Sequence, residues 1–195
     1  MKFYLKDIAD IQTGFSFRER LEFSPSGNVS IIQMRDISES NEIDTAKLIR
    51  TNILNSYNKF QIKANDLIFC PRGLMYTITL VPQTLNATIL TAPLILIRMK
   101  QKDILPAYIQ WFINQPFTQK YFTSRAEGTA VKLLSKSALA EVEIIVPNLS
   151  KQQLIIDIAN LYTNEQQLLK LLAAKRKSYY KKLLMQHISN NSSIN

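Results

Sequence analysis

The last quarter of the chain carries a regular apolar pattern with helical spacing. From Lys151 to about His187 the sequence has no glycine and no proline, and apolar residues recur three, four or seven positions apart. Ser150 is a favoured N-cap residue, and Gln153 completes a capping box three residues later. The pattern predicts one helix of about 37 residues, roughly 55 Å long. Its apolar stripe comprises Leu154, Ile158, Leu161, Leu168, Leu172, Tyr179 and Leu183.

This stripe needs a partner, because the preceding part of the chain is too small to cover a helix of that length. The simplest partner is a second copy of the helix or another long helix, as in a coiled coil. We therefore expect a homodimer formed through the stripe. A helix that folds back on its own domain is the alternative that the pattern leaves open.

The first 149 residues show no single period and instead predict alternating strands and helices. We therefore expect a mixed α/β (α+β) fold: a globular domain over residues 1–149, a long helix over 150–188 and a disordered tail over 189–195. The predicted strands cover residues 29–34, 66–70, 74–81, 89–99 and 141–147. Helices are predicted over residues 106–122, with Pro116 as a break, and over 135–140, while residues 5–11 suit a short helix or a strand.

The net charge of the chain indicates the kind of partner that it binds. The chain has 24 Lys and Arg against 15 Asp and Glu, a formal charge of +9. More than half of this excess lies in residues 150–195, which hold seven basic and two acidic residues. A basic surface of this kind favours an anionic partner, nucleic acid before a membrane.

The composition leaves little room for catalysis or metal binding. Cys70 is the one cysteine, so no intramolecular disulfide can form, which fits a reducing compartment. Its apolar surroundings predict a buried, inert thiol, and the one histidine, His187, is expected in solvent. The four glycines are too far apart for a phosphate-binding loop. We expect no catalytic residue, no metal site and no directly bound cofactor.

No targeting or spanning segment is predicted. The chain begins MKFYLKDIAD, where charges interrupt the apolar residues, unlike a signal peptide. The longest apolar stretches fall well short of the roughly 20 residues that cross a bilayer. We expect a soluble, cytoplasmic protein with no membrane partner.

Several short motifs, in their order and spacing, give the chain a family resemblance. They are LKDIADIQTGFSF at 5–17, IIQMRDI at 31–37, IKANDLI at 62–68, LPAYIQWF at 105–112, GTA at 128–130 and IIVPNLSKQQLI at 144–155. Together they resemble the specificity (S) subunit of type I restriction–modification systems over nearly the whole chain. The usual subunit has two target-recognition domains, each followed by a long helix, whereas this chain has one of each.

The resemblance implies a non-catalytic specificity subunit that reads double-stranded DNA. Its long helix would pack antiparallel against a second helix, and as a dimer it would recognise a bipartite target. The implied partners are two modification subunits, which carry S-adenosylmethionine and methylate adenine, and in some complexes a translocating restriction subunit. The composition and the apolar pattern independently predict a basic, non-catalytic domain followed by a helix whose apolar stripe lacks a partner.

Basic residues in predicted loops are the candidate DNA contacts, because phosphate contacts come from Lys and Arg, and Arg is the usual reader of guanine. Each could equally be a solvated surface charge. Tyr76 and Gln83 are weaker candidates. Lys175, Arg176, Lys177, Lys181 and Lys182 could touch phosphate, face solvent or meet a partner. The candidates proper are Arg18, Arg20, Arg35, Arg72, Arg125 and Lys132.

Two other classes of function stay open at this point. One is a nucleic-acid-binding protein without sequence specificity whose basic helix does the binding. The other is a coiled-coil scaffold with little nucleic-acid role. A specificity subunit should keep binding its target in the presence of excess random DNA, whereas a protein without sequence specificity should not. A scaffold would show no salt-sensitive DNA binding.

Overall fold

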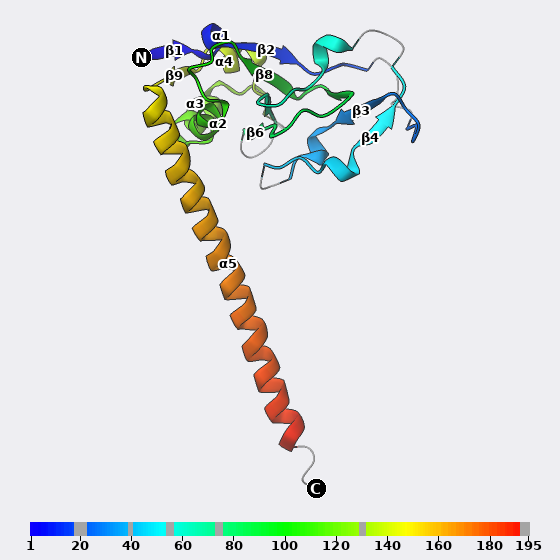
Figure 1. Ribbon diagram of the computed structural model, residues 1–195, viewed down its shortest axis with the longest axis vertical. Helices are drawn as coiled ribbons and strands as arrows, with labels where there is room; N and C mark the ends of the chain where they lie inside the picture. The colour runs from blue at the N-terminus through cyan, green and yellow to red at the C-terminus, as the bar shows by residue number, and fades with distance from the viewer. Residues whose placement is uncertain (18–22, 39–40, 54–56, 73–75, 129–131, 192–195) are drawn as a thin grey trace. The chain divides into compact units, whose positions relative to one another are not determined.

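Short aliphatic strands form three small sheets in the described part of this computed structural model (Figure 1). The structure describes residues 1–17, 23–38, 41–53, 57–72, 76–128 and 132–191, with the side chains of the last helix described through residue 188. The chain divides into two units, Met1–Gln153 and Leu154–Asn195. The sheets all belong to the first unit, so the mixed α+β fold predicted from the sequence is confirmed.

The largest sheet is antiparallel and has the strand order β2–β8–β5–β6. A second sheet has the order β4–β3–β7, in which β3 is antiparallel to β4 and parallel to β7. The third sheet pairs β1 with β9. The strands are β1 (Lys2–Tyr4), β2 (Ala9–Thr13), β3 (Val29–Ile32), β4 (Ile49–Thr51), β5 (Leu67–Phe69), β6 (Ile78–Leu80), β7 (Thr88–Leu90), β8 (Ile95–Met99) and β9 (Glu143–Ile145).

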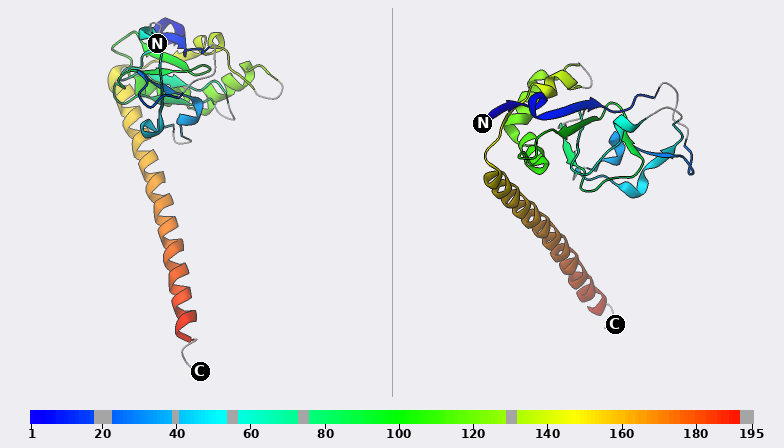
Figure 2. Two further views of the ribbon diagram at one scale, coloured as in Figure 1. Left: turned by 90° about the vertical axis from the view of Figure 1, so that its right-hand side faces the viewer. Right: turned by 45° about the horizontal axis from the view of Figure 1, so that its top comes forward.

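Four short helices gather at one end of the first unit, and the β4–β3–β7 sheet lies at the other end (Figures 1 and 2). The second helix packs against β6 and the third helix, and the fourth packs against the first helix, the third helix and β2. The helices are α1 (Leu5–Ile8), α2 (Pro106–Ile113), α3 (Pro116–Arg125), α4 (Lys136–Ala140) and the long α5 (Leu149–Asn191); three 3₁₀ turns are η1 (Met34–Asp36), η2 (Thr45–Lys47) and η3 (Asn58–Phe60).

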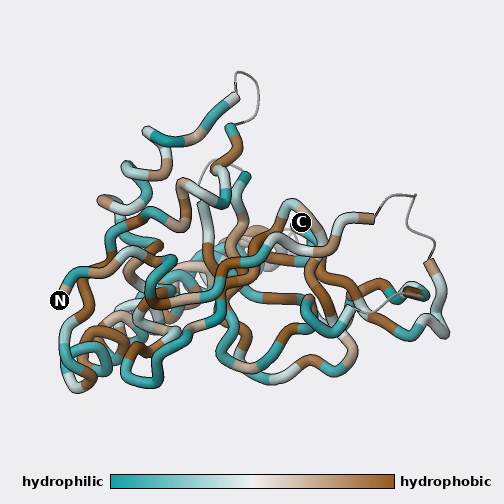
Figure 3. The backbone as a smooth tube through the Cα atoms, turned by 90° about the horizontal axis from the view of Figure 1, so that it is seen from above, coloured by the Kyte–Doolittle hydropathy of each residue, from teal (hydrophilic) through white to brown (hydrophobic). Residues whose placement is uncertain are grey.

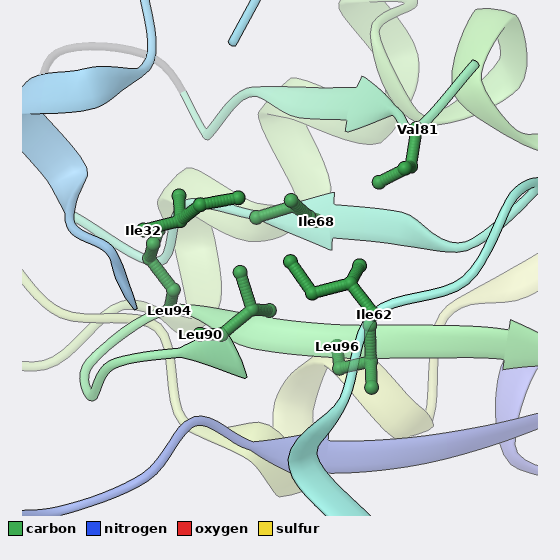
Figure 4. Close-up of a cluster of buried hydrophobic side chains, with 7 residues drawn as sticks. All are labelled: Ile32, Ile62, Ile68, Val81, Leu90, Leu94 and Leu96. Atoms are coloured by element: carbon green, nitrogen blue, oxygen red, sulfur yellow. The ribbon is translucent and has the colours of Figure 1, made fainter. Parts of the chain in front are cut away.

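Buried aliphatic side chains join the two larger sheets. Ile32 of β3 and Leu90 of β7 point toward Ile68 of β5 and Leu96 of β8 (Figure 4). Ile62, Val81 and Leu94 complete this cluster. Hydrophobic segments accordingly concentrate along the strands inside the first unit, and polar segments along its connections (Figure 3). Burial of these side chains is the main favourable contribution to this fold, at about 25 cal/mol per Å² of apolar surface.

The predicted strand over residues 89–99 is wrong as one element. It forms two strands, β7 and β8, which belong to different sheets. Between them a tight turn is closed by a hydrogen bond from the Leu94 nitrogen to the Thr91 oxygen (3.0 Å). Pro93 lies inside this turn, and because it has no N–H group it cannot continue a ladder. The predicted break at Pro116 is confirmed, since α2 ends at Ile113 and α3 begins at Pro116.

The predicted cap of the long helix is wrong by two residues. Asn148, not Ser150, caps the helix, because its Oδ1 atom accepts a hydrogen bond from the Lys151 nitrogen (2.9 Å). Asn and Ser are comparable N-caps, so their propensities do not decide between them. The buried Gln152 decides, because its side chain bonds the backbone of Asp103 (2.9 Å), Leu105 (2.9 Å) and Pro147 (2.9 Å). These bonds hold the first turn of α5 against the first unit.

The stripe predicted on the long helix is exposed along most of its length. Leu154, Ile158, Leu161, Leu168, Leu172 and Tyr179 are each more than half exposed, and Leu183 is half-buried. The helix runs from Leu149 to Asn191, three residues beyond the predicted end. A single helix cannot bury an apolar face on itself, so this stripe is available to a partner.

A buried ion pair fastens β8 to the turn before β5. The buried Asp66 carboxylate accepts two hydrogen bonds from Arg98, at 2.7 Å from Nε and 2.6 Å from Nη2. It also accepts one from the Lys63 nitrogen (2.7 Å), and Arg98 donates to the Gln61 oxygen (3.0 Å). The hydrogen bonds with Asp66 raise the pKa of Arg98 above its ordinary value.

Replacing Arg98 by methionine should therefore destabilise the domain strongly. The Asp66 carboxylate would remain buried without its cation, and removing one partner of a buried pair costs about 3 kcal/mol at the lower end of the usual range. Urea unfolding of the full chain measures the loss. Lys47→Met, which removes an exposed pair with Asp44, is the matched control and should leave the transition unchanged. Equal effects of the two variants would contradict a structural role for the buried pair.

Candidate nucleic-acid interface

The turn that carries Arg72 lies beside the segment that carries Lys132. The backbone of Arg72 forms a β-bridge with Leu133, and the Pro71 oxygen accepts a hydrogen bond from the Leu134 nitrogen (2.9 Å). Leu133 in turn forms a bridge with Glu127, with hydrogen bonds of 2.9 and 3.1 Å in the two directions. Two loops that are 60 residues apart in the sequence are thereby fixed side by side.

This juxtaposition brings together three of the predicted DNA contacts. Arg72 forms the bridge, Lys132 precedes its partner Leu133, and Arg125, the last residue of α3, lies two residues before Glu127. All three side chains are exposed. Among the described residues, no acidic side chain forms an ion pair with any of them. Their charges can therefore meet the phosphates of a nucleic acid without first breaking an internal pair.

Arg72 is held by its backbone and not by its side chain. Its carbonyl oxygen accepts a hydrogen bond from the Cys70 thiol (3.3 Å), in addition to the bridge with Leu133. Cys70 is half-buried, so the prediction of a fully buried thiol is wrong. An exposed guanidinium on a fixed turn is a suitable reader of a base edge.

Arg125 lies over an aromatic ring and lines a hollow of about 530 Å³. Its guanidinium carbon is 5.3 Å from the centre of the Tyr121 ring, a cation–π contact. Burial raises the pKa of Tyr121, and the positive charge of Arg125 opposes that shift. On the same hollow, Lys6 lies over the ring of Tyr4 at 5.2 Å. Phe117, Thr118, Glu141, Val142 and Glu143 complete the lining.

Lys6 is a basic residue of this surface that the sequence did not single out. Its neighbours Leu5 and Ile8 are buried, so α1 turns Lys6 outward. Lys6 shares the hollow with Arg125, and no motif marks that neighbourhood in the sequence.

The other predicted contacts lie elsewhere or outside the described residues. Arg35 is exposed on η1, with its Nε 3.9 Å from Asp36, and η1 packs against the aliphatic cluster of Figure 4 through Met34. The structure does not bring Arg35 into contact with the segments of Arg72 and Lys132. Arg18 and Arg20 lie outside the described residues.

The two weaker candidates differ from each other. Tyr76 is only 3% exposed and packs against Phe69 and Phe122, so it belongs to the core and cannot read a base. Its backbone is fixed by the Gln119 side chain at 3.1 and 2.9 Å. An aromatic residue beside a loop is ambiguous in sequence, because the same residue type serves cores and interfaces. Gln83 is exposed and lines a second, smaller hollow.

Within the described residues, no cluster of three or more His, Cys, Asp or Glu side chains could hold a metal ion. None of the helices in that part of the chain is long and apolar enough to cross a membrane.

The sequence of the chain matches a known family of DNA specificity domains. Residues 1–174 match the family described as type I restriction modification DNA specificity domain. Since this match covers most of the chain, the chain belongs to that family. The resemblance drawn from the short sequence motifs is confirmed. No curated protein sequence matches the chain.

Solved structures share the fold at low sequence identity. The chain is similar to the S subunit of a type I restriction–modification system from M. genitalium, with a TM-score of 0.56, 16% identity and coverage of 91% of this chain and 42% of that one. It is also similar to the HsdS subunit from Thermoanaerobacter tengcongensis, with a TM-score of 0.60, 16% identity and coverage of 86% and 37%.

A third similar structure comes from work on complex assembly and conformational transition of the type I R-M system. Its TM-score is 0.70 at 15% identity, with coverage of 94% of this chain and 43% of that one. The chain thus spans less than half the length of each of these relatives. At such identities the likeness establishes the fold.

Arg72→Ala should weaken DNA binding without unfolding the domain, because the contacts of Arg72 with the described residues come from its backbone. If Arg72 reads a guanine, the loss is about 1–3 kcal/mol and specificity relaxes at one position. If it contacts phosphate, binding weakens on all sequences and the salt slope falls by about one. Titration with target and random duplexes at several salt concentrations distinguishes the two cases.

The matched control is Arg50→Ala, which removes an exposed arginine from β4, away from the bridge at Arg72. It should leave sequence preference intact. Unchanged affinity, salt slope and preference in Arg72→Ala would remove this residue from the interface.

Proposed function

We propose that the chain is the sequence-specific DNA-binding subunit of a type I restriction–modification complex that methylates adenine. In this role it recognises a bipartite target as a homodimer and recruits the modification subunits. The observation that carries the proposal is the extent of the family match, which runs through the first unit and into the long helix, to residue 174. The chain thus combines a domain that would read DNA with the helix that would position this domain in a dimer.

DNA would be held by the exposed basic loops of the first unit. Arg72 and Lys132 project from two loops that the β-bridge at Leu133 fixes together, and Arg125 ends the helix next to them. Contacts to phosphate position a protein on the duplex, and a few side chains then read base edges. Arg18, Arg20 and Arg35 remain candidates for further contacts.

A homodimer accounts for both the exposed stripe and a target in two parts. Two copies paired through α5 would present the same reading domain twice, related by a two-fold axis. Such a dimer would recognise two inverted half-sites separated by a spacer that the protein does not read.

The chemistry would come from the partners. Modification subunits would supply S-adenosylmethionine and the adenine methyltransferase site, and a restriction subunit, where one joins, would supply cleavage. The chain itself would contribute binding and geometry, as a non-catalytic subunit.

Sequencing of methylated bases in the host genome, with and without this gene, tests the proposal. Deletion of the gene should remove adenine methylation at one bipartite motif and leave methylation at other motifs unchanged. The full chain should restore the lost motif. Methylation that does not change on deletion, or purified chain that methylates DNA without other subunits, would overturn the proposed role.

The helix should also set the length of the spacer. Duplicating residues 159–165 adds one heptad after Glu165 and keeps the apolar stripe nearly in phase. Each helix becomes roughly 10 Å longer. DNA rises about 3.4 Å per base pair, so the half-sites should move apart by about three base pairs or more. The bases within each half-site should stay the same, because the reading loops are untouched.

Methylated-base sequencing of the insertion strain measures this change. A strain that keeps methylating the original spacer would contradict the role of the helix as a spacer, and altered half-site bases would show that the helix takes part in reading. A duplication of the same length in the exposed polar segment at Lys102 is the control and should leave the spacer unchanged.

A further inference from the structure

The apolar stripe of α5 is interrupted by two opposite charges. From Leu154 to Tyr179 its positions follow a regular four–three spacing, in which Glu165 falls between Leu161 and Leu168, and Lys175 falls between Leu172 and Tyr179. The next position in this spacing is Lys182, beside Leu183. Both charged side chains are exposed, and neither forms an ion pair with a described residue. They lie ten residues apart, about 15 Å along the helix, so they cannot pair with each other on one chain.

These two charges discriminate between ways of pairing the helix with a second copy. In a parallel dimer with the two copies in register, Glu165 would face Glu165 and Lys175 would face Lys175. Like charges facing each other in a seam that excludes water are strongly unfavourable. In an antiparallel pair with its two-fold axis at Lys170, Glu165 of each copy faces Lys175 of the other. Both charges of each helix then gain a partner of opposite sign.

The same axis also pairs the apolar positions. With the axis at residue 170, Leu168 faces Leu172 of the other copy, and Leu161 faces Tyr179. Ile158 faces Lys182, whose aliphatic stem can cover it while the ammonium group reaches water. Every seam position between Ile158 and Lys182 therefore meets a compatible residue.

Positions that flank the seam agree with this register. In an antiparallel coiled coil each flanking position meets the equivalent position of the partner. Tyr162 then lies beside Arg176 of the other copy, which suits a cation–π contact. Asn164 lies beside Ser178, so two polar side chains meet. Close to the axis, Leu169 meets Leu169 of the other copy, and Leu171 meets Leu171 of the other copy.

Neighbouring registers fit less well. Moving one helix by a heptad in one direction puts Glu165 opposite Leu168 and Lys175 opposite Ile158. Moving it in the other direction puts Glu165 opposite Lys182 but leaves Lys175 opposite Leu172 and Leu161 opposite Gln186. The first shift leaves both charges without a partner of opposite sign, which is costly in a seam. The second shift keeps an ion pair for Glu165 but loses the apolar contact between Leu161 and Tyr179.

From this pattern we infer that α5 binds α5 of a second copy in antiparallel orientation, with the two-fold axis at Lys170. Two symmetric Glu165–Lys175 ion pairs select this register together with the Leu161–Tyr179 and Leu168–Leu172 contacts. The inference rests on the homodimer of the proposed function and deepens it, because it states which residues meet. It also assigns Lys175, Arg176 and Lys182 to the protein interface, and it leaves Lys170, Lys177 and Lys181 on the outer face.

Disulfide trapping of the full chain tests the register. Cys70 is first replaced by serine, and Leu161→Cys and Tyr179→Cys are then made as separate proteins. Under oxidation neither protein alone should form a cross-link, because Leu161→Cys then faces Tyr179 of the other copy, and Tyr179→Cys faces Leu161. An equimolar mixture should form a covalent heterodimer, visible on a non-reducing gel. Leu161→Cys that cross-links to itself, or a dimer that gives no cross-link in the mixture, would overturn the register.

Charge reversal tests the role of the ion pairs. Glu165→Lys and Lys175→Glu should each raise the dimer dissociation constant by about tenfold or more, since each places two like-charged pairs in the seam. An equimolar mixture of the two, or the double variant E165K/K175E, should recover the affinity. Lys170→Glu is the matched control, because it makes the same charge change on the outer face at the axis. Equal weakening by Lys170→Glu and Lys175→Glu would contradict the ion pairs.

Light scattering of the unmodified chain separates this inference from the proposed function. A chain that is monomeric at all concentrations would remove the homodimer itself. A dimer that becomes monomeric in the double variant Leu168→Asp with Leu172→Asp, but fails the disulfide test, would keep the homodimer and remove only the register.

Discussion

An isolated helix cannot bury its own apolar stripe, and the organisation of this chain follows from that constraint. The first unit has its own core between two sheets, and Gln152 in the first turn of α5 bonds to its backbone. The helix beyond that turn exposes leucine, isoleucine and tyrosine along about 30 residues of its length. A monomer would leave these side chains in water at a cost of about 25 cal/mol per Å². An exposed apolar face of this length favours association with a partner helix.

The sequence predicted whether each segment is a helix or a strand better than it predicted which other segments each one contacts. Apolar periodicity found the long helix, and turn residues found the break between α2 and α3. It missed that residues 89–99 divide between two sheets, because β-branched residues run on both sides of Pro93 and strand propensity does not say which sheet a strand joins. The cap at Asn148 was missed for a similar reason: the contacts of Gln152 that fix it come from residues more than 40 positions earlier.

The candidate interface was predictable in its residue types and not in its arrangement. Arg72 and Lys132 were recognisable as basic residues in loops, and loops carry binding residues more often than packed segments do. Their closeness depends on one β-bridge between Arg72 and Leu133, which no local pattern encodes. Tyr76 shows the reverse case, because its chemistry suits stacking on a base while its actual partners are Phe69 and Phe122.

The first and last strands of the reading domain are paired with each other. The chain enters through β1 and leaves through β9, and the amino group of Met1 donates to the oxygen of Val146 at 2.9 Å. A domain whose two ends meet can be exchanged as one cassette, because a new domain needs only the same pair of strands at its base. One crossover near Pro147 would then join a different reading domain to the same helix. Recombination between genes of this architecture could change the bases that are read while the geometry of assembly is retained.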